Sequence, residues 1–231
     1  MASNLTGFTL TRPQKSSAYD MVMRLPILAW SVVLALAQAV ELERYRHAAD
    51  PALPGVIVLN IAMRLSMIGY LVILAATVVV RTPPIGKARG AEPRVSALLG
   101  SFLISAVVLF PRRELAPAVS WVSTLLMLLG DSIAAVVLIQ LRGSFSIMAE
   151  ARQLVTSGAY RYVRHPLYFA EEIATIGSVM QFLSAWTTML LVAQIAFQLR
   201  RIANEETLLT DVFPEYAKYR QKTARIIPGI Y

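Results

Sequence analysis

The sequence predicts an all-α integral membrane protein with five or six transmembrane helices. Three observations support this fold class. Hydrophobic residues make up 56% of the 231 residues and charged residues only 16%, whereas about a quarter of a soluble domain is charged. Long apolar stretches recur along the chain, and about 20 such residues are needed for a helix to cross a bilayer. Lysine and arginine also concentrate in alternate connecting segments, as membrane proteins of fixed orientation require.

Three regions follow one another along the chain. The polar residues 1–20 carry no cleavable signal pattern, and we expect them to form a cytoplasmic lead. Residues 21–141 are expected to form a membrane scaffold, and residues 142–231, which combine apolar helices with dense charge, are expected to carry the functional site. The four spans predicted in the scaffold are Met21–Val40, Leu53–Val80, Val95–Phe110 and Pro117–Leu141.

A fifth apolar region, Leu167–Leu199, is longer than one span requires. We interpret it as a helical hairpin that turns near Gln181–Ser184. Its halves, Pro166–Gln181 and Ser184–Ala203, are short for full spans, so a single tilted helix is the alternative. Six spans would place sixteen lysines and arginines on the cytoplasmic side and four on the other. This positive-inside distribution favours the hairpin and predicts that both termini are cytoplasmic.

Composition also limits the classes of binding partner that we expect for this protein. The net charge of +8 and the pI near 10.0 are explained by basic loops that face an anionic leaflet, and no interleaved basic and aromatic surface indicates nucleic acid. The chain has no cysteine and only two histidines, which gives no metal-binding pattern. We therefore expect a bilayer and a lipid as partners, with no nucleic acid and no metal.

Several local expectations concern the scaffold and its connections. Met148–Thr156 is expected to form a short interfacial helix that ends at Ser157–Gly158. Arg64 and Asp131 lie within the second and fourth spans, where buried charges are typically paired, and we expect them to neutralise each other. Small residues permit close helix contact in membranes, and Gly69 and Gly130 are expected to serve this purpose.

The densest chemistry lies in residues 157–172, SGAYRYVRHPLYFAEE. Ionisable groups at a membrane helix usually mark a working site. Pro166 suits the first turn of a helix, and a helix that begins there places Tyr168, Glu171 and Glu172 on one face. His165 would cap this helix. The free N–H groups at the start of this helix would favour an anionic ligand group. Gly158 would allow the backbone to approach the ligand closely.

A second polar cluster reads RRIANEE and contains Arg200, Arg201, Glu205 and Glu206. Because a hairpin brings its two ends together, this cluster should return beside His165. The fold-back therefore predicts one pocket built from two motifs. Plainer interpretations stay open: the arginines as headgroup anchors, the tyrosines as an aromatic belt, and the glutamates as partners of the neighbouring arginines.

The ordered set of motifs resembles the membrane-embedded isoprenylcysteine carboxyl methyltransferase and phospholipid methyltransferase family. The resemblance covers residue 154 to the C-terminus. The residues that carry it are Gly158-Ala159-Tyr160, Arg164-His165-Pro166-Leu167-Tyr168, Glu205-Glu206, Phe213-Pro214-Glu215-Tyr216 and Tyr219. The resemblance implies an enzyme that uses S-adenosylmethionine to methylate a lipid-borne acceptor, either a prenylcysteine-type carboxylate or a phospholipid amine. It would reside in the bacterial inner membrane or an endomembrane.

The resemblance also implies roles for individual residues. Arg164 and Arg201 would orient the acceptor or a carboxylate. Glu171 and Glu172, which depart from the family pattern, would determine acceptor specificity, and either could take a proton from an amine acceptor. The cofactor would contact Gly158, Ala159, Tyr160, His165, Pro166, Tyr168, Glu205 and Glu206.

Two other functions fit parts of the sequence. Membrane sterol reductases are similar in their C-terminal half and use NADPH, but they have more spans than this chain can supply. A small transporter or assembly factor would carry its functional charges at mid-membrane, in discontinuous helices. Here the dense cluster lies at a helix end, which favours the enzyme.

Overall fold

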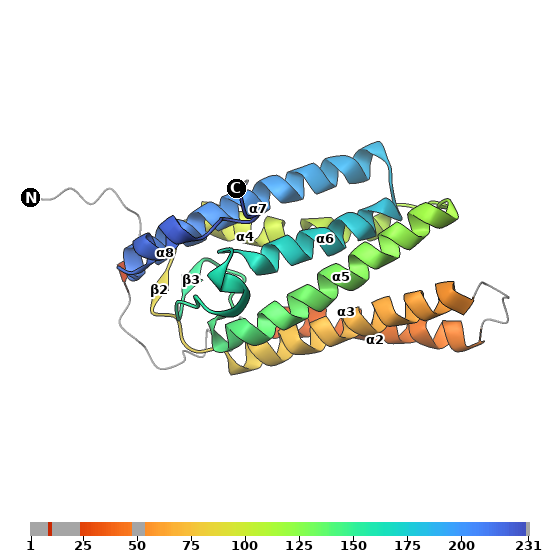
Figure 1. Ribbon diagram of the computed structural model, residues 1–231, viewed down its shortest axis with the longest axis horizontal. Coiled ribbons are helices and arrows are strands. Elements are labelled where there is room, and N and C mark those ends of the chain that lie inside the picture. Colours follow the sequence, from red (N-terminus) through yellow and green to blue (C-terminus); the bar gives the residue numbers. More distant parts are fainter. Residues whose placement is uncertain (1–8, 11–23, 48–53, 230–231) are drawn as a thin grey trace, which may run out of the picture.

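The structure, a computed structural model, describes residues 9–10, 24–47 and 54–229. It is an elongated bundle of helices with a small sheet near one end (Figure 1). The helices are α2 (Leu25–His47), α3 (Pro54–Val80), α4 (Glu92–Phe102), α5 (Pro117–Leu141), α6 (Pro166–Met180), α7 (Ala185–Val212) and α8 (Tyr216–Lys222). The 3₁₀ segments are η1 (Leu103–Leu109), η2 (Arg142–Ser144) and η3 (Gly158–Arg161), and the strands are β1 (Thr9–Leu10), β2 (Gly86–Lys87) and β3 (Glu150–Ala151).

Four helical segments of the described chain are long and apolar enough to cross a membrane. They are Leu25–Arg44, Gly55–Val80, Glu92–Leu109 and Pro117–Ser144, and they correspond to the four predicted scaffold spans. The third of them combines α4 with η1. Helix α6, with 15 residues, is shorter than these segments, and α7, although 28 residues long, is less apolar, so the total of five or six spans stays a prediction. Of the predicted lead 1–20, only Thr9–Leu10 lie within the described residues.

Helix α5 lies between α3 and α6, while α2 packs on α3 and α4 packs on α7. The apolar core joins α3, α5 and α6 near the end that carries the sheet. Its members include Val78, Leu138 and Ala170, which are buried. Large apolar side chains such as Val33 and Val136 are exposed on the outer faces. An apolar exterior is what a bundle surrounded by lipid requires, because lipid chains replace water around it.

The predicted hairpin is confirmed. Helix α6 ends at Met180 and α7 begins after Ser184, whose hydroxyl accepts the backbone N–H of Thr187 in a capping box. The turn lies beside the connection between η1 and α5, since the Arg113 N–H donates to the Gln181 carbonyl at 2.8 Å. Helix α6 therefore runs alongside α5, and α7 returns beside α6 towards the end of the bundle that carries α8 (Figure 1).

Close contact between α5 and α6 depends on two glycines. A Cβ atom at Gly130 would lie 2.4 Å from the backbone nitrogen of Ala174, and one at Gly177 would lie 2.7 Å from the Ser123 carbonyl oxygen. The sequence-based expectation of close packing at Gly130 is met. At Gly69 it is wrong, because a Cβ there has no neighbour within 4 Å.

Replacing Gly130 by valine is expected to destabilise the bundle by about 1–3 kcal/mol, because the added methyl groups must push α6 away from α5. The measurement is thermal unfolding in detergent micelles. The matched control is Gly69→Val, in which the side chain enters open space and should change the midpoint little. Equal midpoints for the two variants would contradict the close packing.

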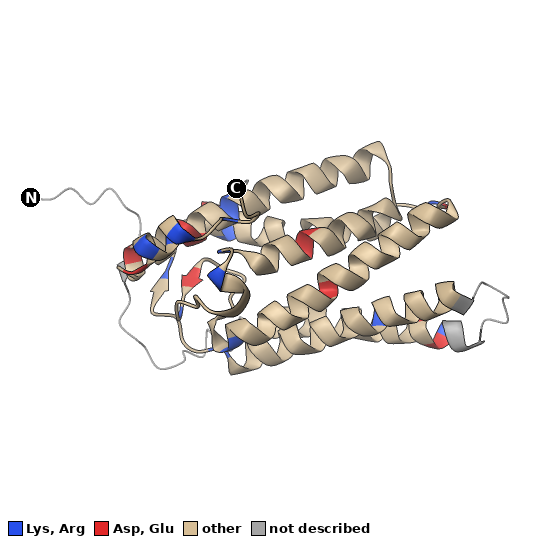
Figure 2. Ribbon diagram, in the orientation of Figure 1, with Lys and Arg blue, Asp and Glu red and all other residues tan. Residues whose placement is uncertain are grey.

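The expected pairing of Arg64 with Asp131 is replaced by contacts to α2. The Arg64 guanidinium donates to Gln38 at 2.8 Å and lies 3.6 Å from the Glu41 carboxylate. Arg64 therefore joins α3 to α2. Charged residues otherwise concentrate at the end of the bundle where α8 lies, and the middle of the helices is largely uncharged (Figure 2).

The predicted interfacial helix over Met148–Thr156 is wrong. This segment contains β3, which pairs antiparallel with β2, while β1 pairs with the other edge of β2. Two flanking bonds extend the pairing: Ile85 donates to the Ala151 carbonyl at 2.8 Å and Ala88 to the Ala149 carbonyl at 2.9 Å. Because these cross-strand bonds engage the backbone groups, a helix cannot form.

Candidate functional site

Helix α6 begins where proline predicts it. Pro166 occupies the first turn and His165 precedes it in a non-helical conformation. The backbone before it is anchored to the C-terminal segment, because the N–H groups of Arg164 and His165 donate to the carbonyls of Ala224 and Arg225 at 2.9 and 3.1 Å. The start of α6 is thus held by residues that follow α8.

The two sequence motifs meet at this end of the bundle, as the fold-back predicts. The Tyr168 hydroxyl donates a short hydrogen bond to the Glu205 carboxylate. The His165 Nε2 atom lies 3.3 Å from Glu206 Oε1. The rings of His165 and Tyr168 stack with their centroids 5.5 Å apart. The hairpin therefore brings both motifs to a single site.

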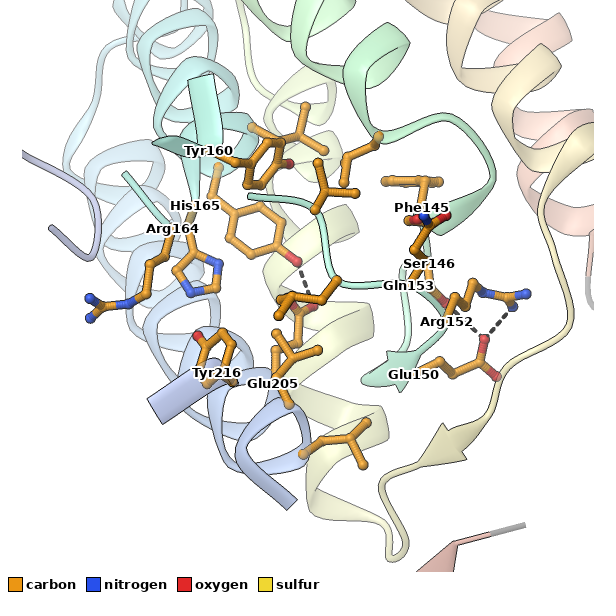
Figure 3. Close-up of a pocket in the computed structure, with 18 of the residues that line it drawn as sticks. Phe145, Ser146, Glu150, Arg152, Gln153, Tyr160, Arg164, His165, Glu205 and Tyr216 are labelled. Carbon is orange, nitrogen blue, oxygen red and sulfur yellow. Dashed lines mark hydrogen bonds and ion pairs between the residues drawn. The ribbon is translucent and has the colours of Figure 1, made fainter. Parts of the chain in front are cut away.

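A cavity opens beside these residues and encloses about 790 Å³, counting open solvent at its mouth. One wall comes from η3 and the start of α6, with Tyr160 and His165, and from α7 and α8, with Glu205 and Tyr216; the other comes from the segment that follows α5 (Figure 3). The remaining lining residues are Leu141, Ser144, Phe145, Ser146, Met148, Glu150, Arg152, Gln153, Leu154, Val155, Arg164, Leu167, Tyr168, Leu208, Leu209 and Tyr219.

The second wall was missed by sequence reasoning. Phe145, Ser146 and Gln153 face the cavity across from His165 (Figure 3). Glu150 accepts hydrogen bonds from Arg152 at 2.6 Å and from Ser146 at 2.9 Å. The available signal was the polar alternation of Ser146, Glu150 and Arg152, which fits an extended segment better than a helix.

Glu206 lies at the centre of a cationic cluster. Its Oε1 atom accepts from Arg164 Nε at 2.7 Å, and its Oε2 atom lies 3.2 Å from Arg225 Nε. Burial by itself would raise the pKa of Glu206, but hydrogen bonds from His165 and Arg164 and their positive charges lower it to about 2. Glu206 is not among the cavity-lining residues; it fastens the tail to the start of α6.

Arg164 completes this fastening. Besides Glu206, its guanidinium donates to the carbonyl of Arg220 at 2.9 Å and, in a shorter contact, to that of Thr223. Although Arg164 borders the cavity, its charged end points away from it (Figure 3). The structure thus gives Arg164 a role in holding α8 and the residues after it.

Arg201 connects the site to α4. Its side chain is buried, lies 3.4 Å from Glu205 and stacks its guanidinium 4.5 Å above the Tyr168 ring. It also donates to the Ser101 hydroxyl at 2.8 Å and to the Ser146 carbonyl at 3.3 Å. Arg201 does not line the cavity. It holds Tyr168 and Glu205 in place and ties the second wall to α7.

Glu171 and Glu172 lie deeper in the bundle and do not line the cavity. Tyr70 on α3 donates to Glu171 at 2.9 Å. Gln194 on α7 donates to Glu172 at 2.8 Å and to the Gly100 carbonyl at 2.9 Å. These contacts join α6 to α3, α4 and α7.

The sequence predicts that Gly158 allows the backbone to come close to a ligand, but its close neighbour in the structure is the Gln140 side chain. Gly158 has a φ of +62°, and a Cβ there would lie 2.3 Å from the Gln140 side chain. The same side chain accepts the N–H of Ala159 at 2.8 Å. Gly158, Ala159 and Pro166 are outside the cavity lining, and they position Tyr160 and His165, which are part of it.

Two tyrosines of α8 complete the cavity. The Tyr219 hydroxyl donates to the Tyr160 carbonyl at 2.6 Å, and burial raises the pKa of Tyr219 to about 12. Tyr216 is 1% exposed, and its hydroxyl has no hydrogen-bond partner within the described part of the chain. Burial also raises the pKa of Tyr216. A buried neutral hydroxyl that lines a cavity is available to a ligand.

Among the described residues, no three acidic or histidine side chains are grouped so that they could hold a metal ion. The cavity is lined by aromatic rings, hydroxyls, basic side chains and the carboxylates of Glu150 and Glu205. Fold and site together define a membrane-embedded helical protein with a polar and aromatic cavity at one end of its bundle.

Comparisons with known proteins find a family that matches part of this chain. The sequence model of the isoprenylcysteine carboxyl methyltransferase family matches residues 122–211, which include most of α5, all of α6 and nearly all of α7. Through this region the chain is similar to that family. The matched region carries the hairpin and both motifs, while Tyr216 and Tyr219 lie beyond it.

Two curated relatives share about half their length with the chain. The cobalt-zinc-cadmium resistance protein CzcN of Cupriavidus metallidurans is 34% identical over 116 residues, 48% of this chain and 53% of the relative. The protein-S-isoprenylcysteine O-methyltransferase of Schizosaccharomyces pombe is 36% identical over 110 residues, 44% of this chain and 46% of the relative.

A solved structure, the eukaryotic intramembrane Ras methyltransferase (isoprenylcysteine carboxyl methyltransferase), aligns with 93% of this chain and 90% of its own. The TM-score is 0.44 at 17% sequence identity, too low to establish a common overall fold.

Proposed function

We propose that this protein transfers a methyl group from S-adenosylmethionine to a lipid-borne acceptor in the membrane. The observation that carries the proposal is the single cavity into which the hairpin brings His165, Tyr168 and Glu205. The match of residues 122–211 to the methyltransferase family supports the reaction class. The positive-inside charge distribution favours a cytoplasmic position for this end of the bundle.

The residues of the cavity fit such a cofactor. The Glu205 carboxylate can accept hydrogen bonds from an ammonium group or from ribose hydroxyls. The Tyr216 hydroxyl, buried without a partner among the described residues, can bond to a further polar group of the ligand. Phe145 and Tyr160, on opposite walls, offer faces for a planar base (Figure 3).

When bound, the cofactor supplies a methyl group on an electrophilic sulfonium. The protein holds the reactants in position and excludes water from them, and it supplies no acid–base catalysis. Tyr168 and Arg201 fix the Glu205 carboxylate, and the segment after α5 covers the cavity from the other side. Holding two reactants in a fixed geometry away from water can supply most of the acceleration that such a displacement needs.

Acceptor identity belongs to the same proposal. A carboxylate acceptor needs no general base, whereas an amine acceptor must release a proton. Glu171 and Glu172 are bonded to Tyr70 and Gln194 and do not line the cavity. This arrangement favours an acceptor that needs no proton removal, a carboxylate. Incubation with methyl-labelled cofactor and a prenylcysteine or an amine phospholipid decides between them by which product carries label.

Replacing His165 by alanine is expected to weaken binding of S-adenosylhomocysteine by ~10-fold, equivalent to about 1.4 kcal/mol, because the ring lines the cavity and stacks on Tyr168. Isothermal titration calorimetry in detergent measures the affinity. The control is Tyr162→Ala, a neighbouring side chain that is 68% exposed. Unchanged affinity in the His165 variant, or tight binding of NADPH instead, would refute the cofactor assignment.

A further inference from the structure

A second cavity lies next to the first and is bounded by other elements. It encloses about 1700 Å³, open solvent included, between the start of α2, one side of α4 and the loop that carries β2. Ser146, Met148 and Glu150 line both cavities. A single extended segment therefore separates the candidate cofactor site from this larger space.

The larger cavity has an apolar interior. Trp30 of α2 and Phe102 of α4 meet edge to face there, with ring centroids 5.3 Å apart. Ile27 and Leu98 extend the same surface. Both helices belong to segments that are long and apolar enough to span a membrane. Hydrocarbon is the natural occupant of a space between two such helices, because its transfer from water is favourable.

The cavity also has a strongly basic rim. Arg81, Lys87, Arg89 and Arg94 contribute four cations, while Glu150 contributes the one carboxylate among its lining residues. That carboxylate already pairs with Lys87 at 3.3 Å and with Arg152 at 2.6 Å. The exposed side chains of Arg89 and Arg94 thus place positive charge next to an apolar interior. This combination matches an amphiphile with an anionic headgroup.

We propose that this cavity binds an anionic phospholipid of the membrane, with its acyl chain against Trp30 and Phe102 and its headgroup near Arg89 and Arg94. Charge complementarity identifies the occupant, since each basic side chain near an anionic membrane surface contributes about 1 kcal/mol. The site is separate from the proposed methyl transfer. It adds a lipid contact to the segment 146–150, which is the shared wall of the two cavities.

The test uses Trp30 as the reporter. The chain has three tryptophans, so the substitutions W121F and W186F leave Trp30 as the single fluorophore. Full-length protein in detergent micelles is titrated with phosphatidylglycerol or with phosphatidylcholine, each brominated in its acyl chains. Bromine quenches indole at short range. We expect half-maximal quenching at a ~10-fold lower concentration of the anionic lipid.

Two variants distinguish lipid binding at the basic rim of this cavity from general attraction of an anionic lipid to a basic protein. The double substitution R89Q/R94Q should abolish the preference for phosphatidylglycerol. The matched control R161Q removes an exposed cation of the same basic end that does not line the cavity, and it should preserve the preference. Circular dichroism confirms that all three proteins remain helical.

Equal quenching by the two lipids would overturn the proposal, as would a preference that survives R89Q/R94Q. Absence of quenching by either lipid would mean that another part of the chain fills the cavity, which also overturns it. The readout does not involve methyl transfer. Its failure would leave the proposed enzymatic function untouched, and failure of that function would leave this site untouched.

Discussion

Replacing Glu206 by glutamine is expected to lower stability by about 3 kcal/mol, because it leaves buried cations without their common counter-charge. Arg164, His165 and Arg225 all face this carboxylate, whose side chain is only 6% exposed. For a chain of this size the unfolding midpoint should fall by about 10 °C. The measurement is thermal unfolding in detergent, monitored by circular dichroism.

The Glu206 carboxylate also makes the stability of the fold depend on pH. Its pKa is lowered from 4.5 to about 2 in the folded protein, so the folded state favours the charged form. The stabilisation is complete above pH 4.5 and is lost as the pH falls towards 2. Glu206→Gln should remove this part of the acid sensitivity.

An exposed glutamate provides the control for both measurements. Glu215 lies before α8 and is exposed. Its replacement by glutamine should shift the midpoint by less than about 2 °C, as surface substitutions usually do. A Glu206→Gln protein as stable as the Glu215 variant would show that the cluster does not hold the tail.

The sequence predicts the helices well because their signals are local. Apolar length, Pro166 at a helix start and the polar residues at Gln181–Ser184 locate every major element near its observed position. The meeting of Glu205 with Tyr168 also follows, since the second helix of a hairpin runs back past the start of the first. These inferences need only the helical rise and the length of apolar runs.

The features that the sequence does not predict arise from contacts between segments that are distant in the chain. The strand at Glu150–Ala151 exists because Gly86–Lys87 lies beside it, and no local pattern specifies that partner. Likewise, Arg64 reaches Gln38 rather than Asp131 because of how the helices are rotated. The ion pair between Glu206 and Arg225 has the same origin, because no local pattern places Arg225 beside that carboxylate.

Replacing Arg201 by lysine is expected to slow the proposed methyl transfer by ~100-fold, the cost that a misplacement of about 1 Å carries at a reacting centre. Lysine keeps the charge, but it cannot pair with Glu205, reach Ser101 and cover the Tyr168 ring at once, as the planar guanidinium does. The Glu205 carboxylate and the Tyr168 hydroxyl would then lose their fixed positions in the cavity.

A positioning role makes a distinctive kinetic prediction. The KM for S-adenosylmethionine should rise and kcat should fall in the Arg201→Lys protein, while the unfolding midpoint changes by only a few degrees because the buried charge remains. The adjacent Arg200 supplies the matched control. Its side chain is 64% exposed and pairs with Glu92 at 3.1 Å, so Arg200→Lys should retain wild-type kinetics. Because the two variants make the same substitution at neighbouring positions of one helix, equal activities would exclude Arg201 as the residue that orders the cavity.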